Sequence, residues 1–177
     1  MSVRSLNHAV LFVSDVERSA EFYIEVLGFE PIVEYPRAVF LRGTASANDH
    51  DLGLLQANAE RPSFGTVGLY HLAWEVETLA ELAAARDRMQ SAGALTGAAN
   101  HAATKAIYGQ DPDGIEFEVT WLVPDSRIAE EVVPGVEPTR PLDLDAEIAR
   151  YGERTPGGPR TDRHLYDGLL DRLGLRP

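Results

Sequence analysis

The strongest constraint on the fold of this chain is an internal repeat. His71 follows His8 by 63 positions, and Thr78 follows Asp15 by the same interval. In both places a strand-like segment with a histidine near its start leads into a helix that begins with a capping pattern. Two copies of one unit predict two modules packed into a single domain around a shared cleft. The alternative is a chance likeness between unrelated strand–helix pieces, which the matched histidine and helix start both disfavour.

The first module is predicted to run strand, helix and then three strands. Residues 6–13 are apolar and β-branched, as in a strand. Ser14 and Asp15 are typical helix-start residues, and Ser14 with Glu17 matches a capping box. Apolar residues then recur at helical spacing until Gly28, which favours a helix end. Three extended stretches follow, near 29–35, 38–43 and 51–56.

The second module repeats this order of elements. Thr78 with Glu81 gives a second capping box ahead of a helix rich in Ala, Leu and Arg, and Gly93 favours its end. The Pro-Asp-Gly turn at 112–114 joins the last two of three further strands. Those strands are expected near 94–99, 104–110 and 115–122.

These elements predict an α+β fold. Two βαβββ modules, at about residues 5–57 and 68–122, would form one domain over residues 1–123. At 177 residues the chain is long enough for one well-buried core, or for two small modules that share one.

The chain changes character after this domain. Residues 124–177 hold seven of the eleven prolines, with short helices expected near 143–151 and 163–173. Such a segment cannot build a core of its own, so it is either a partly disordered tail or an arm. The leucines of its helices need a surface to cover them. This favours an arm that lies on the body or on a partner subunit.

Composition excludes several classes of function. A net charge of -12 argues against nucleic acid or an anionic membrane as the partner, because phosphate binding needs clustered Lys and Arg. The absence of cysteine leaves no disulfide, no thiolate nucleophile and no Cys-based zinc site. The sequence contains no long apolar stretch of the kind that forms a signal peptide or a membrane span. The expected location is therefore cytoplasmic. Any bound metal must take nitrogen and oxygen ligands.

Three residues form a candidate set of such ligands. His8 and His71 occupy equivalent positions of the repeat, and Glu118 lies on the final predicted strand. Glu116 is a competing candidate, because alternation places it on the same face of that strand. Two imidazoles and one carboxylate leave about three coordination positions open, which suits Fe(II) that must hold a substrate and O2 together.

The double βαβββ pattern, the histidine opening each module and the Asp-Pro-Asp-Gly-x-x-x-Glu ending at 111–118 resemble the vicinal oxygen chelate superfamily. This superfamily includes glyoxalases, extradiol dioxygenases, fosfomycin-modifying enzymes and bleomycin-binding proteins. The resemblance covers about residues 5–122. It implies a cupped mixed β-sheet around a metal site whose ligands are His8, His71 and Glu118.

Three further positions resemble the extradiol enzymes of the catechol 2,3-dioxygenase type. His101 precedes Tyr108, which lies ten positions before Glu118, and His50 opens a His-Asp-apolar strand. The resemblance implies that His50 handles protons, while His101 and Tyr108 hydrogen-bond the substrate oxygens. It also implies Fe(II) or Mn(II) as the cofactor, and a homodimer or higher homo-oligomer. The expected function is ring opening of a small aromatic diol by O2.

Two alternative functions stay open. A glyoxalase-like isomerase or lyase would use a fourth protein ligand from the last strand of the first module, where only Gln56 is available. A metal-free small-molecule binding protein, such as an antibiotic-sequestering one, would usually lack the ligand residues. Asp111 and Asp113 are interpreted as turn residues rather than ligands, and His164 is given no role.

Overall fold

The chain forms two compact units. The computed structural model describes residues 5–59, 65–131, 136–137, 139–158, 168, 171–172 and 174. The first unit comprises Met1–Tyr70 with Gln110–Glu116, and the second comprises His71–Gly109 with Phe117–Pro177. The turn at 110–116 therefore belongs to the first unit, although the sequence repeat assigns it to the second module.

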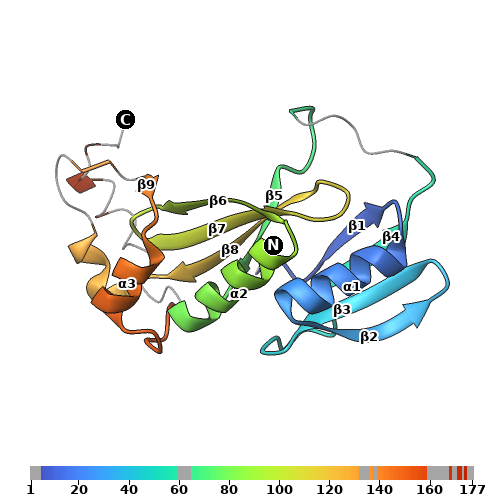
Figure 1. The fold of residues 1–177 in the computed structure, drawn as a ribbon, viewed down its shortest axis with the longest axis horizontal. Coiled ribbons are helices and arrows are strands. Elements are labelled where there is room, and N and C mark those ends of the chain that lie inside the picture. Colours follow the sequence, from blue (N-terminus) through green and yellow to red (C-terminus); the bar gives the residue numbers. More distant parts are fainter. Residues whose placement is uncertain are drawn as a thin grey trace, which may run out of the picture. The chain divides into compact units, whose positions relative to one another are not determined.

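The first unit has the predicted order of strand, helix and three strands (Figure 1). Its four strands are arranged β1-β4-β3-β2. β1 runs parallel to β4, while β3 is antiparallel to both β4 and β2. The bounds are Ala9–Val13 for β1, Val16–Leu27 for α1, Phe29–Tyr35 for β2, Ala38–Gly43 for β3 and Leu52–Gln56 for β4.

Helix α1 begins directly after Asp15, one of the two predicted start residues, but without the predicted capping box. Its N-cap is Asp15, whose side chain accepts a hydrogen bond from the Arg18 N–H, so the expected capping box of Ser14 with Glu17 is wrong. Ser14 instead donates through its backbone N–H and its hydroxyl to Asp113. The helix ends as predicted at Gly28, whose φ of 76° is readily adopted by glycine.

The second unit repeats the strand order of the first. Its sheet is arranged β5-β8-β7-β6, with a short strand β9 added at the β6 edge. The capping box of Thr78 with Glu81 is confirmed at the start of α2. The bounds are His71–Glu75 for β5, Leu79–Ser91 for α2, Leu95–Asn100 for β6, Thr104–Gln110 for β7 and Glu116–Leu122 for β8. The predicted α+β class and both βαβββ modules are confirmed.

The segment after β8 packs on the second unit where it is described. It contains the 3-10 helix Asp125–Glu130, β9 at Arg140–Pro141 and α3 at Leu144–Tyr151. β9 pairs antiparallel with β6, and the Tyr151 ring lies 5.2 Å from the Trp121 ring. His164 and most of the helix expected near 163–173 lie outside the described residues.

A close approach in the second core fixes the end of β7. A Cβ atom at Gly109 would lie 2.6 Å from Met89 Cε and 2.7 Å from Phe117 Cζ. Both side chains are almost fully buried, so neither has room to move aside. Glycine is therefore needed at position 109, directly after Tyr108. The packing of Met89 and Phe117 against Gly109 fixes the backbone of β7 next to Tyr108.

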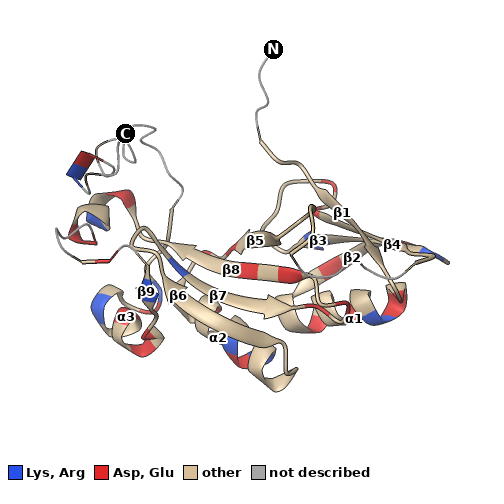
Figure 2. Cartoon of the chain, turned by 90° about the horizontal axis from the view of Figure 1, so that it is seen from above, with Lys and Arg blue, Asp and Glu red and all other residues tan. Residues whose placement is uncertain are grey.

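In the described part of the chain, Lys and Arg are dispersed over the helices among Asp and Glu, and β8 also carries acidic residues (Figure 2). No helix of that part is both long and apolar enough to cross a membrane.

Candidate functional site

Two histidines lie together in the first unit. The His8 and His50 rings have their centroids 4.3 Å apart, although 41 residues separate them in the chain. β1 begins at Ala9, so His8 immediately precedes the strand instead of lying within it as predicted. His8 is exposed, and its Nδ1 lies 2.8 Å from the side-chain oxygen of Asn7.

A polar network fixes the backbone next to both histidines. Asp51 accepts hydrogen bonds from the Gly43 N–H at 2.9 Å, the Ser46 hydroxyl at 2.8 Å and the Asn48 amide at 2.7 Å. Burial would raise the pKa of Asp51, but these donors outweigh burial and lower it. Asn48 also donates to the Asn7 carbonyl at 2.8 Å. Asn48 therefore connects Asn7, which precedes His8, with Asp51, which follows His50.

The role of Asn48 was not predicted from the sequence. The polar run Asn48-Asp49-His50-Asp51 was its only signal, and such a run is equally typical of a simple loop.

An apolar face of the first sheet continues from these histidines. Phe40 on β3 packs edge-on against His50 at 5.1 Å between ring centroids. Gly53 lies opposite both Val10 and Phe40 in the sheet register. A Cβ atom there would approach the Phe40 ring at 3.2 Å and Val10 at 3.3 Å, so glycine lets the two side chains meet. Phe12, two residues beyond Val10, is 71% exposed and extends this apolar face.

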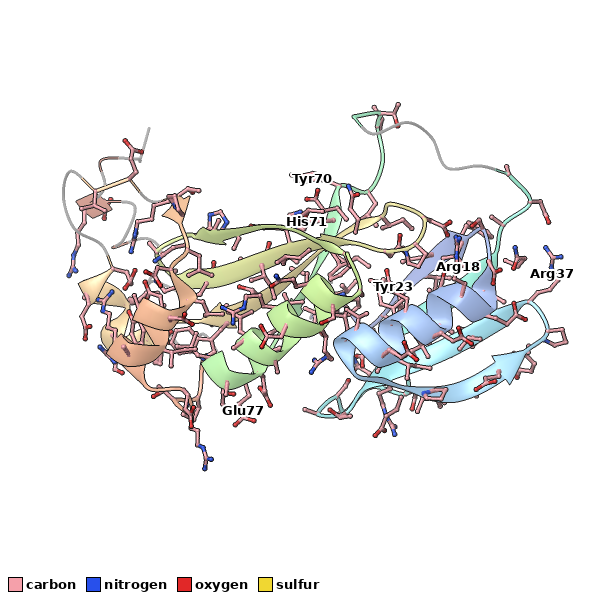
Figure 3. All side chains as sticks on the ribbon, viewed as in Figure 1. Arg18, Tyr23, Arg37, Tyr70, His71 and Glu77 are labelled. Carbon is pink, nitrogen blue, oxygen red and sulfur yellow. The ribbon has the colours of Figure 1, made fainter. Side chains whose placement is uncertain are left out.

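The second unit holds the other two candidate ligands. His71 Nε2 lies 3.4 Å from Glu118 Oε2, with 27% of the His71 side chain and 12% of the Glu118 side chain exposed. Tyr70, which precedes His71 in the chain (both are labelled in Figure 3), interacts with the competing carboxylate of Glu116. The charge of Glu116, followed by its hydrogen bond, raises the pKa of that tyrosine. The two glutamates, which the alternation of the strand places on one face, thus have different partners.

A histidine–tyrosine pair lies beside them in the same unit. His101 Nε2 is 2.6 Å from the Tyr108 hydroxyl, and the Tyr108 ring lies 6.0 Å from the His71 ring. The other ring nitrogen of His101, Nδ1, lies 3.1 Å from the Thr139 hydroxyl. Thr139 was not predicted from the sequence, because nothing in the repeat indicates a residue of the C-terminal segment.

The six predicted residues thus fall into two groups. His8 and His50 lie together in the first unit, whereas His71, Glu118, His101 and Tyr108 lie in the second. Over the residues that the structure describes, no three His, Asp or Glu side chains are grouped as a metal site. The three-ligand set with His8 therefore stays a prediction.

The Asp111–Gly114 turn has the structural role predicted for it. Asp111 accepts hydrogen bonds from the backbone N–H of Asp113 at 2.9 Å and of Ile115 at 2.7 Å. Its other oxygen accepts from the Tyr23 hydroxyl at 3.2 Å. Burial raises the pKa of Asp111. Asp113 pairs with Arg18 at 3.0 Å, so both aspartates hold the turn against α1.

Gln56 is also committed to the backbone. Its amide oxygen accepts from the Val16 N–H at 3.1 Å, and its amide nitrogen donates to the Ser14 carbonyl. The Gln56 side chain thus hydrogen-bonds backbone groups at the start of α1, so it is not available as a metal ligand.

The pair of His71 with Glu118 fits a divalent cation. Ligands about 2.0–2.2 Å from one ion lie roughly 3.0–3.5 Å from each other. The 3.4 Å separation falls in that range, and imidazole with carboxylate is a donor set that Fe(II) and Mn(II) accept.

Comparison with known proteins establishes the family. The model of the Glyoxalase/Bleomycin resistance protein/Dioxygenase superfamily matches residues 5–119, and the chain belongs to this superfamily. A catechol-2,3-dioxygenase of Bacillus subtilis (strain 168) is 32% identical over 117 residues, which cover 64% of this chain. The match covers 40% of that protein, so the chain spans about two fifths of the curated relative's length.

Solved structures share the fold. A glyoxalase/bleomycin resistance protein/dioxygenase domain from Frankia sp. EAN1pec has a TM-score of 0.56 at 23% identity, covering 67% of this chain and 98% of that one. A glyoxalase/dioxygenase from Nostoc punctiforme has a TM-score of 0.57 at 20% identity, covering 66% and 90%. A lactoylglutathione lyase from Agrobacterium tumefaciens has a TM-score of 0.53 at 21% identity, covering 68% and 95%. At these identities the likeness concerns the fold alone.

Proposed function

We propose that this protein is an extradiol dioxygenase that opens a catecholic ring with O2. Fe(II) or Mn(II) would be held by His8, His71 and Glu118. The observation that carries the proposal is the contact between His101 and Tyr108, in the same unit as the pair of His71 with Glu118. The similarity to a catechol-2,3-dioxygenase supports it.

The chemistry of a catechol calls for the residue types at these positions. A diol must lose protons before it can chelate a cation, and His50 is the proposed group that accepts a proton and later returns it. Tyr108, bonded to His101, is a donor for charge that develops on the substrate oxygens. A bound metal would supply adjacent open positions for diol and O2. The apolar face of Val10, Phe12 and Phe40 suits an aromatic ring.

The experiment that tests the proposal is oxygen uptake with a panel of catechols. Protein loaded with Fe(II) or Mn(II) under argon is mixed with each diol in air-saturated buffer. A yellow ring-opened product, with one O2 consumed per diol, is the expected result. The metal-free protein is the control. If neither metal form consumed oxygen with monocyclic, biaryl or fused-ring diols, the proposal would be wrong.

The two alternatives predict other results. An isomerase of the glyoxalase type needs a fourth protein ligand, and the commitment of Gln56 to α1 argues against that. It would also prefer Ni or Zn and consume no oxygen. A sequestering protein would bind its ligand equally well without metal. Metal analysis of purified protein and calorimetric titration of a diol with and without Fe(II) separate these cases.

A further inference from the structure

We propose that the C-terminal segment is part of the catalytic apparatus and that Thr139 is a positioning residue for His101. The segment lies beyond residue 119, where the family match ends. Thr139 would fix the ring of His101 so that its Nε2 meets the Tyr108 hydroxyl. The positioning of His101 by Thr139 is inferred from the geometry of these contacts alone. Its effect on turnover rests on the proposed function.

The turn that carries His101 is strained. Ala102 has φ of 60°, the only positive value at a non-glycine residue in the described part of the chain. A left-handed alanine costs about 1–2 kcal/mol, so other contacts must hold the turn. The Ala102 N–H donates to the Asn100 side-chain oxygen at 2.9 Å, which is one such contact.

A buried ion pair lies below this turn. Lys105 is fully buried, and its Nζ donates to the Asn100 side-chain oxygen at 2.9 Å and to the Ala102 carbonyl at 3.2 Å. Its charge is balanced by Glu131, 2.8 Å away and also with no exposed side-chain surface. A buried cation needs such a partner, so Glu131 of the C-terminal segment holds Lys105 against the turn.

A third group of contacts comes from the same segment. Glu147 on α3 accepts from the Asn100 amide at 2.9 Å. Arg140 on β9 donates to Glu131 at 2.8 Å. Both ends of the Asn100 side chain are thus held, one by Lys105 and one by Glu147.

The register of β9 on β6 determines where Thr139 lies. Pro141 pairs with Ala99, and Arg140 pairs with Asn100. Continuing this antiparallel register by one residue places Thr139 opposite His101, where its hydroxyl meets Nδ1 at 3.1 Å. The position of this hydroxyl is therefore set by the sheet and not by a free loop.

Together these contacts leave His101 bonded through both ring nitrogens. A neutral imidazole has one N–H donor and one acceptor, and a hydroxyl can either donate or accept, so the Thr139 hydroxyl can bond Nδ1 in either tautomer and hold the ring with Nε2 facing Tyr108. Removing the hydroxyl leaves Nδ1 without this partner and lets the ring rotate. The Tyr108 hydroxyl would then face a partner whose orientation is no longer fixed.

The test uses the whole 177-residue chain without metal and nitrogen NMR of its histidine rings. Thr139→Val removes the hydroxyl at nearly constant volume, and Thr139→Ser restores it. Thr155→Val is the matched control, because its hydroxyl also lies in the C-terminal segment but bonds the Tyr151 carbonyl. We expect the valine variant to shift the His101 Nδ1 and Nε2 signals, while the serine and control variants keep them.

The second readout is turnover of the metal-loaded enzyme. Loss of one oriented hydrogen bond is expected to lower kcat about tenfold in Thr139→Val at unchanged metal content, with recovery in Thr139→Ser. Unchanged His101 signals in Thr139→Val would overturn the inference. If the signals move but no variant, including the wild type, opens a catechol, the positioning stands and only the proposed function fails.

Discussion

His71 Nε2 and Glu118 Oε2 lie 3.4 Å apart on the neighbouring strands β5 and β8. The two residues are 47 positions apart in the chain, and the repeat by itself relates His71 to His8 and not to a glutamate. It is the strand order of the second sheet, with β8 beside β5, that brings a carboxylate to the histidine. This pair gives the prediction of a metal centre its firmest structural support.

The first prediction compares the two glutamates of β8. Glu118→Gln should lose most bound Fe(II), by roughly 10–100-fold or more in affinity, because a neutral amide replaces an anionic ligand. Glu116→Gln is the matched control on the same face of the strand, since its carboxylate interacts with Tyr70. Metal content after gel filtration, measured by mass spectrometry, checks both. Equal metal loss in the two variants would contradict the assignment of Glu118.

The second prediction concerns proton transfer. His50→Gln should retain metal but slow turnover by roughly 10²–10⁴-fold, the usual contribution of a general acid or base. Glutamine keeps polarity at this position without titrating near neutral pH. Single-turnover oxygen uptake near pH 7 measures the effect, and His164→Gln, at a histidine outside the repeat, is the control. Full activity of His50→Gln would show that another group moves the proton.

The sequence predicted most of the fold because its signals are local. The helix stop at Gly28, the box of Thr78 with Glu81 and the turn at 112–114 each depend on a few neighbouring residues. The failure at Ser14 has a long-range cause. Its hydroxyl and N–H are bound by Asp113, 99 residues away, and Asp15 is left to cap α1.

The candidate site was predictable only in part for the same reason. The repeat indicated His8 and His71, and a family resemblance indicated the others. No local pattern could place Thr139 opposite His101, because that contact depends on β9 pairing with the edge of β6. Nor could the alternation of β8 separate Glu116 from Glu118, since it gives both the same face.

The third prediction uses the close approach at Gly53. Gly53→Ala should displace the Phe40 ring, because the added Cβ would lie 3.2 Å from that ring and 3.3 Å from Val10. We expect a loss of about 1 kcal/mol of unfolding free energy and a weaker affinity for an aromatic diol. Urea unfolding and ligand titration measure the two effects.

Gly97→Ala is the control for this change. A Cβ atom at Gly97 would meet nothing within 4 Å, and Gly97 also lies in a strand. That variant should be neutral or slightly more stable, because alanine restricts the unfolded chain. Equal stability of Gly53→Ala and Gly97→Ala would show that the sheet yields without cost.

The last prediction is the acid sensitivity caused by Glu131. Burial alone would raise the pKa of this carboxyl, but the hydrogen bond from Lys105 leads the interactions that lower it from 4.5 to about 2. A carboxyl whose pKa is depressed in the folded state stabilises the fold at pH values above 4.5, and that stabilisation is lost as the pH falls toward 2. The shift corresponds to about 3 kcal/mol of unfolding free energy. Urea unfolding between pH 6 and pH 2.5 should show this loss in the wild type.

Glu131→Gln should be less stable near neutral pH by about 3–5 kcal/mol, because Lys105 is left as an unpaired buried charge. The stability of this variant should also depend less on pH between pH 6 and pH 2.5. Glu130→Gln, at the exposed neighbour, is the control and should follow the wild type. If the wild type and Glu131→Gln lost stability in parallel below pH 4.5, the acid sensitivity would have to come from other carboxylates.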